Sequence, residues 1–115
     1  MLIFRDALSS EEQFANASPE QMQAEMEKWN TWMGGLAAQG KLIGGEPLVP
    51  HGKVLRGTAK KITDGAFMEG KEIVGGYVNI KAESLDEAAE LAKGCPTLSI
   101  ETGSVEVREI MKLQQ

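Results

Sequence analysis

The sequence has one cysteine, one histidine and one tyrosine among its 115 residues. With Cys95 alone, no disulfide can form within the chain, which is typical of proteins in a reducing compartment. His51 also stands alone, whereas a transition-metal site needs several converging His, Cys or carboxylate ligands. The C-x-x-C, H-E-x-x-H and Walker motifs are missing as well. We therefore expect no metal site and no bound cofactor.

Long apolar runs and clustered cations are missing too. No stretch approaches the roughly 20 apolar residues that a membrane-spanning helix needs. The first residues lack the basic leader of a signal peptide, so we expect a cytoplasmic protein without membrane contact. The net charge is -5, whereas nucleic-acid binding needs clustered Lys and Arg side chains. Lys60 and Lys61 would point to opposite faces of a strand, so we do not expect nucleic-acid binding.

What the sequence does contain is typical of one globular domain. Apolar residues make up 42% and charged residues 25%, both ordinary values for a folded protein. A chain of 115 residues also has the usual length of a single domain. We therefore expect one domain over residues 1–115.

Two helices are predicted from their capping residues. Ser18 and Gln21 match a capping box, with Pro19 at the first helical position. Apolar residues then recur at helical spacing, which predicts one buried stripe. The stripe consists of Met22, Met26, Trp29, Met33 and Leu36. A second capping box at 84–87 predicts a shorter helix that Gly94 ends.

Four segments are predicted as strands, namely 1–5, 54–62, 73–82 and 105–111. Segment 41–52 is rich in glycine and proline and is expected to be irregular, with a short extended piece at Leu42-Ile43. This order matches the split βαβ plan of a ferredoxin-like α+β domain. Because two helices cover one face of such a sheet, we expect the other, partly apolar face to pair with a second copy in a homodimer.

A set of short motifs runs through nearly the whole chain. Its centre is the turn Thr63-Asp64-Gly65-Ala66-Phe67 with the acidic and basic residues that follow. The other pieces are Arg5, W-x-x-W-M at 29–33, then 44–48, 75–77, 85–88, Cys95-Pro96 and 103–108. The ordered set resembles the DGPF-type branch of the YCII-related family. The resemblance implies a ferredoxin-like domain that dimerises into an α/β barrel.

The resemblance implies no single activity. Some related proteins are thought to carry a His-Asp pair in a pocket, and a few are linked to the degradation of chlorinated aromatics. In this chain Ala66 replaces the proline of the motif, and residues 97–102 contain no histidine where family members often have one. An acid–base mechanism through that histidine therefore does not carry over to this chain.

Asp64 is the candidate catalytic residue. A carboxylate at the mouth of a pocket can act as a general base if burial raises its pKa. Alternatively, Asp64 only accepts bonds from backbone N–H groups in its turn. Arg5 is a candidate for binding an anionic ligand and Glu46 for meeting a cation or a substrate proton, although a plain ion pair between them is the alternative. Four aromatic residues are candidates for the wall of a ligand pocket: Trp29, Trp32, Phe67 and Tyr77.

Two functions stay open at this point. One is a non-catalytic or regulatory dimer that binds a small ligand, which is favoured because no residue has an unambiguous catalytic role. The alternative is a lyase, isomerase or dehalogenase that acts on a small aromatic or enol-like molecule. The sequence does not decide whether the protein is an enzyme.

Overall fold

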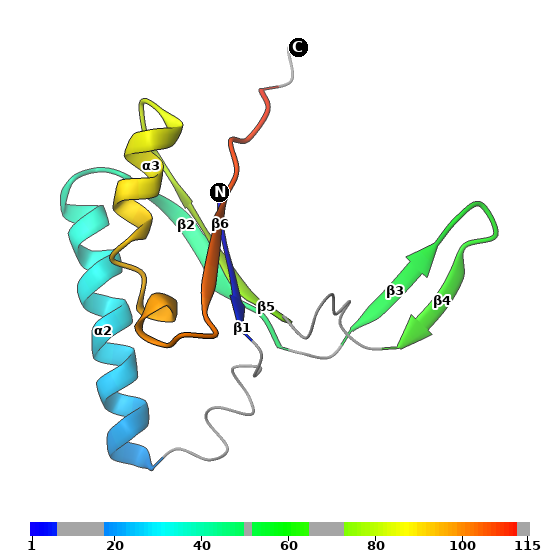
Figure 1. Cartoon of the computed structure of the whole chain (residues 1–115), viewed down its shortest axis with the longest axis horizontal. Helices are drawn as coiled ribbons and strands as arrows, with labels where there is room; N and C mark the ends of the chain where they lie inside the picture. Colours follow the sequence, from blue (N-terminus) through cyan, green and yellow to red (C-terminus); the bar gives the residue numbers. More distant parts are fainter. Residues whose placement is uncertain (7–17, 50–51, 65–72, 113–115) are drawn as a thin grey trace.

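The computed structural model describes residues 1–6, 18–49, 52–64 and 73–112. Its body is a four-stranded antiparallel sheet with two helices on one face (Figure 1). The sheet runs in the order β2-β5-β1-β6. These strands are β1 Leu2–Asp6, β2 Leu42–Pro47, β5 Ile73–Ile80 and β6 Ser104–Val107. Strands β1 and β5 lie in the centre of the sheet, and β2 and β6 lie at its edges. This is the arrangement expected of a ferredoxin-like α+β domain, as predicted.

Both predicted helices form at their predicted caps. Helix α2 spans Pro19–Ala38, and Ser18 and Gln21 bond each other's backbone N–H groups in a capping box. Helix α3 spans Leu85–Ala92, and the Ser84 hydroxyl accepts a bond from the Glu87 backbone N–H at 3.0 Å. A 3-10 helix, η1, follows at Pro96–Ser99. In the described part of the chain, no helix is both long and apolar enough to cross a membrane.

The core lies between the sheet and the helices. Leu2 and Phe4 of β1 and Val78 of β5 meet Ala92 of α3 and the neighbouring Cys95 there. Leu2 is the only fully buried large side chain among the described residues. Since residues of a strand alternate between its faces, Leu2, Phe4 and Val78 define the helix face of the sheet. Strand β1 is central in the sheet, because it pairs with β5 on one side and β6 on the other.

The predicted buried stripe of α2 is wrong for its first half. Leu36 is buried, and Trp29 and Met33 pack against the core, but Met26 is 58% exposed. The cause is length, because a helix of 20 residues rises about 30 Å, whereas sheet strands of four to eight residues span roughly 13–26 Å. The N-terminal half of α2 therefore extends beyond the sheet (Figure 1).

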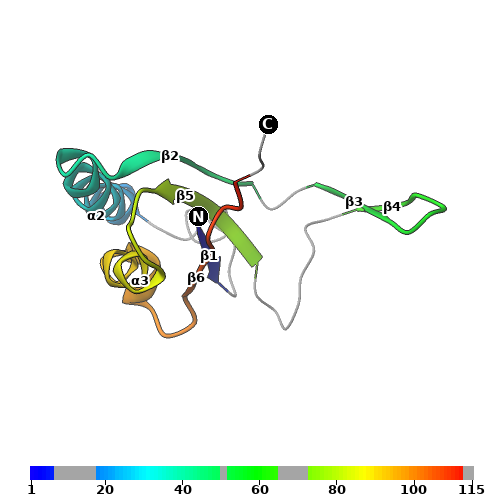
Figure 2. The ribbon, with the colours of Figure 1, turned by 90° about the horizontal axis from the view of Figure 1, so that it is seen from above.

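The predicted single strand at 54–62 is also wrong. Strands β3, Lys53–Arg56, and β4, Lys61–Asp64, form a separate antiparallel hairpin. Its turn needs two residues with positive φ, Gly57 at 67° and Lys60 at 54°. Gly57 suits that conformation, but a lysine there gives no turn signal in the sequence. The hairpin projects away from the helices, as the view from above shows (Figure 2).

Segment 41–52 is less irregular than predicted, because β2 occupies Leu42–Pro47. Its glycines serve close packing. A Cβ atom on Gly45 would lie 2.5 Å from the Tyr77 backbone oxygen on β5, so only glycine fits at this approach of the two strands. The last strand, β6, is shorter than predicted and ends at Val107, while Ile110 and Met111 are exposed.

Candidate functional site

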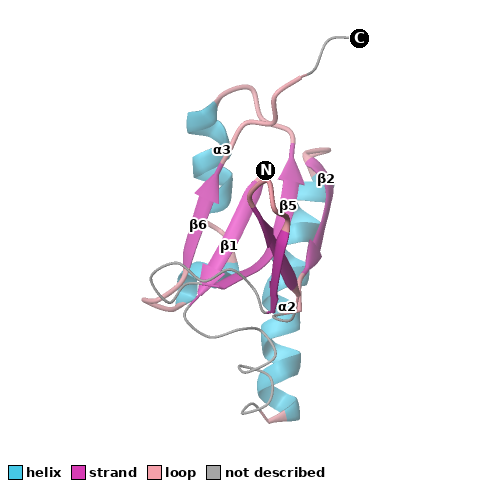
Figure 3. Ribbon diagram, turned by 90° about the vertical axis from the view of Figure 1, so that its right-hand side faces the viewer, coloured by secondary structure: helices cyan, strands magenta, loops and turns pink. Residues whose placement is uncertain are grey.

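The sheet has one face without helices, which we call the open face (Figure 3). The ring of Phe4 lies 5.0 Å from that of Trp29 of α2, so Phe4 points to the helix face. Its neighbours Ile3 and Arg5 therefore point to the open face. Strand pairing aligns Ile3 with Tyr77 on β5 and Glu106 on β6.

Arg5 holds a carboxylate on this face. Its Nη1 donates a hydrogen bond to Glu106 Oε1, and Arg108 Nη1 donates to Glu106 Oε2 at 3.1 Å. Bonds from Arg108 and Arg5 lower the pKa of Glu106 below its ordinary value of 4.5. The cluster is therefore charged near neutral pH, and the contribution of Glu106 to stability is lost only as the pH falls below 4.5 through this lowered pKa. Two guanidinium groups around one carboxylate leave a net charge of +1.

Glu46 and Tyr77 occupy the other half of the same face. They are direct cross-strand partners on β2 and β5. The suggested ion pair between Arg5 and Glu46 is replaced by the pair of Arg5 with Glu106, since β5 lies between the strands of Arg5 and Glu46. Glu106 was missed as a site residue. The sequence does indicate the face on which Glu106 lies. Glu106 stands between Val105 and Val107, so in a strand it points to the face opposite to these two valines.

Asn79 adds an unusual acceptor to the open face. It pairs with Gly44 two residues beyond Tyr77, on the same side of β5. Its Oδ1 atom is buried and has no hydrogen-bond partner within the described part of the chain. A buried acceptor without a donor is rare in folded proteins and destabilising.

The two tryptophans lie on the other side of the sheet. Trp29 and Trp32 contact each other at 5.8 Å between ring centroids, and both contact Phe4. Trp32 Nε1 donates a bond of 3.0 Å to the Leu91 carbonyl oxygen of α3. The sheet thus separates this aromatic cluster from Arg5, and the cluster's contacts are those of a core. The structure does not bring the predicted pocket residues together on one face.

Asp64 lies on the hairpin rather than at the sheet. It is the last residue of β4, directly opposite Lys53, whose Nζ donates to its Oδ1. Its side chain is 86% exposed, so Asp64 does not lie in an enclosed pocket. Phe67 and His51, the other candidates in this region, lie outside the described residues.

Replacing Asp64 with asparagine should change the free energy of unfolding by less than about 0.5 kcal/mol, because an exposed ion pair contributes little. Urea unfolding of wild type, Asp64→Asn, Lys53→Gln and the double variant measures the coupling between the two side chains. If Asp64→Asn alone lowered the free energy of unfolding by more than about 2 kcal/mol, Asp64 would not be an exposed residue in a weak ion pair.

Cys95 is buried beneath the helices. Desolvation by this burial raises the pKa of its thiol above the ordinary value of 9.0, so the thiolate is scarce at neutral pH. Cys95 is therefore a core residue and not a nucleophile. In the described residues, no group of three or more His, Cys, Asp or Glu side chains could hold a metal ion.

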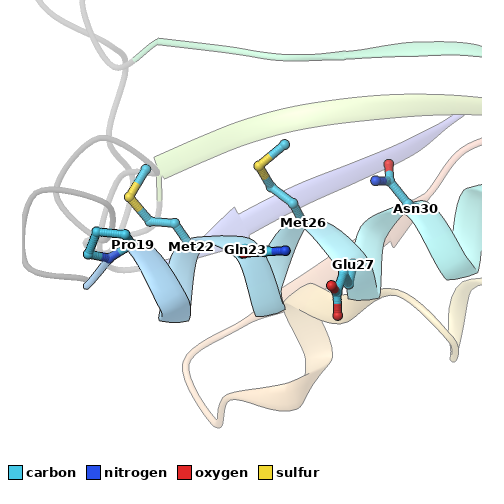
Figure 4. A pocket seen from close by; sticks show the side chains of 6 residues that line it. All are labelled: Pro19, Met22, Gln23, Met26, Glu27 and Asn30. Carbon is cyan, nitrogen blue, oxygen red and sulfur yellow. The ribbon is translucent and has the colours of Figure 1, made fainter.

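A shallow depression on α2 is a further candidate (Figure 4). Met22 and Met26 point to one side of the helix there, and Glu27 points away from them. All its lining residues come from this one helix: Pro19, Met22, Gln23, Met26, Glu27 and Asn30. None of the residues predicted to bind a ligand lies in it, so the open face remains the stronger candidate.

A family model for the YCII-related domain matches residues 5–114, which is almost the whole chain. The chain belongs to the YCII-related family. A search of curated proteins finds no match. The match to the YCII-related domain spans both helices and every strand from the end of β1 onward. The family description names no reaction.

Proposed function

We propose that this YCII-related protein is a homodimeric, non-catalytic domain that binds a small aromatic acid on the open face of its sheet. The observation that carries the proposal is that three residues predicted to bind a ligand share this face. They are Arg5 on β1, Glu46 on β2 and Tyr77 on β5. The DGPF-type branch and a cytoplasmic location belong to the same proposal, and they rest on the motif at 63–72 and on the single thiol.

The chemistry of the face suits an anion that carries a ring. Arg5 and Arg108 together offer more N–H donors than Glu106 can accept, and their excess charge of +1 attracts a ligand carboxylate. The Tyr77 ring and the Ile3 side chain are cross-strand partners beside this cluster and offer an apolar surface for an aromatic ring.

Dimerisation would complete the site. Two sheets packed face to face lie about 10 Å apart with their side chains interdigitated, so a bound ligand would lie among the side chains of the two open faces. Two open faces joined in this way form the dimeric α/β barrel that the sequence led us to expect. Because water would be excluded from that space, the attraction between Arg5 and a carboxylate would be stronger there than on a bare surface.

Catalysis by a lyase, isomerase or dehalogenase is the alternative function, and the position of Asp64 speaks against it. A general base must reach the proton that it removes. Asp64 instead lies on the hairpin with Lys53, and the carboxylate on the open face nearest to Arg5 is already engaged by two arginines. These contacts favour binding over turnover.

The test is a thermal-shift titration with benzoate and with benzamide, its neutral analogue. Benzoate at tenfold its Kd should raise the Tm of wild type by about 5 °C, because a ligand that binds only the native state stabilises it. Benzamide should shift the Tm far less. The variant Arg5→Gln should lose the response to benzoate, while Lys93→Gln, at the exposed residue after α3, should keep it. Equal responses of wild type and Arg5→Gln would refute the site, and conversion of the added acid would favour the enzyme.

A further inference from the structure

The β3–β4 hairpin carries an apolar pair that the chain itself leaves uncovered. Leu55 and Ile62 are cross-strand partners and are 60% and 61% exposed. A two-stranded hairpin alone is at best marginally stable in water. The protein has a radius of gyration of 15.7 Å, against about 13 Å for a compact chain of this length, and the hairpin projects from its body. Such an arm gains stability only from a surface that it packs against.

The hairpin projects on the side of the open face. In Figure 1 the helices lie to the left of the sheet and the hairpin to the right. Figure 3 looks onto the open face, and the hairpin stands in front of it. A molecule seated on the open face would therefore lie beside the hairpin and meet its side chains.

Charge indicates what that molecule is. Residues 53–64 contain four basic residues and one acidic residue, which gives the hairpin a net charge of +3. Since the whole chain carries -5, the other 103 residues carry -8. A second copy of this chain is thus an acidic partner for the hairpin. Contact with the hairpin would also offset the repulsion between two acidic bodies that face each other.

The area of the open face indicates that contact between the two sheets alone is too small for a stable dimer interface. Four strands of about six residues each cover a footprint of about 400 Å², from spacings of about 4.8 Å between strands and 3.3 Å between residues. Stable interfaces bury about 800 Å² on each partner. A dimer formed through the open faces therefore needs further contacts, and the hairpin lies where it can supply them.

We propose that the β3–β4 hairpin is an arm that grips the second copy of this chain in the dimer. Two-fold symmetry makes the contact reciprocal, so each copy holds the flank of its partner with one arm. Leu55 and Ile62 pack against the partner, and Lys60 of the turn and Lys61 at the start of β4 lie over its acidic surface. This inference rests on the proposed homodimer.

The first test measures dimer dissociation of the double variant Leu55→Ser/Ile62→Ser by sedimentation velocity over a wide concentration range. The Kd should rise by about 100-fold or more, since four apolar side chains leave the interface of each dimer. The matched control is Leu85→Ser, because Leu85 is also 60% exposed but begins α3 on the helix side. Its Kd should equal that of wild type.

A second variant tests the arm without touching its apolar pair. Lys60→Gln/Lys61→Gln should weaken the dimer by about tenfold at low salt, and the difference should shrink at high salt as the charges are screened. The matched control is Lys28→Gln/Lys93→Gln, which removes two charges from exposed positions of the helices. This variant keeps the test decisive if the serine variant fails to fold.

The results of these measurements distinguish the proposed hairpin contact from the proposed homodimer. A wild-type protein that stays at the chain mass of 12.4 kDa at every concentration would overturn both proposals. A wild-type dimer whose Kd is unchanged by both hairpin variants would overturn the arm alone and leave the sheet-to-sheet dimer standing. In that case the hairpin surface serves some other occupant.

Discussion

Replacing Trp29 with alanine should lower the free energy of unfolding by about 3 kcal/mol, near the lower end for a large aromatic residue because Trp29 is only partly buried. Its ring packs on Phe4 at 5.0 Å and on Trp32 at 5.8 Å between centroids. The substitution therefore removes one of the two aromatic contacts between α2 and the central strand β1. Urea unfolding measures it as a lower midpoint with an unchanged slope.

Met26 provides the matched control on the same helix. It belongs to the same apolar stripe one turn earlier, but it is 58% exposed beyond the edge of the sheet. Met26→Ala should cost less than about 0.5 kcal/mol, since an exposed position away from special contacts tolerates substitution. If the two variants lost equal free energy of unfolding, the whole apolar stripe of α2 would be buried, and its first half would not extend beyond the sheet.

The local signals in the sequence were sufficient for much of the fold. The caps at Ser18 and Ser84 locate both helices, because a hydroxyl that accepts a backbone N–H bond acts within one turn. The alternation around Leu2 and Phe4 identifies a strand. The extent of burial was not predictable in this way. Met22 and Leu36 follow the same helical spacing, and only the length of the sheet decides which of them it covers.

The hairpin and the site depend on longer-range geometry. Lys60 adopts a positive φ, but lysine is not a residue type that predicts this conformation. The turn between β3 and β4 was therefore not predicted, and its residues were assigned to one strand. Arg5, Glu46 and Tyr77 were recognised by residue type, but their common face follows from pairing between three strands. Trp29 was recognised in the same way, and the contact with Phe4 puts it on the opposite face. Residue type alone does not distinguish these two outcomes.

Replacing Gly103 with alanine should cost about 2–3 kcal/mol of stability, because the new methyl group has no space. A Cβ atom there would lie 1.9 Å from the Thr97 carbonyl oxygen and 2.9 Å from its carbonyl carbon. These are backbone atoms of η1, so no side-chain rotation relieves the overlap. The Gly103 backbone N–H also donates a bond of 3.0 Å to the Ile100 carbonyl, which any shift would strain.

The position matters because it fixes where β6 begins. The preceding residue, Thr102, donates a hydroxyl bond of 2.7 Å to Asp6 Oδ1 at the end of β1, and β6 starts directly afterwards at Ser104. A displaced Gly103 should therefore disturb the register that brings Glu106 to Arg5. The control is Gly34→Ala in α2, where a Cβ meets nothing within 4 Å, and this variant should gain about 0.5–1 kcal/mol. Thermal melts of both variants decide the matter, and a Gly103→Ala protein as stable as wild type would show that the loop before β6 is not closely packed.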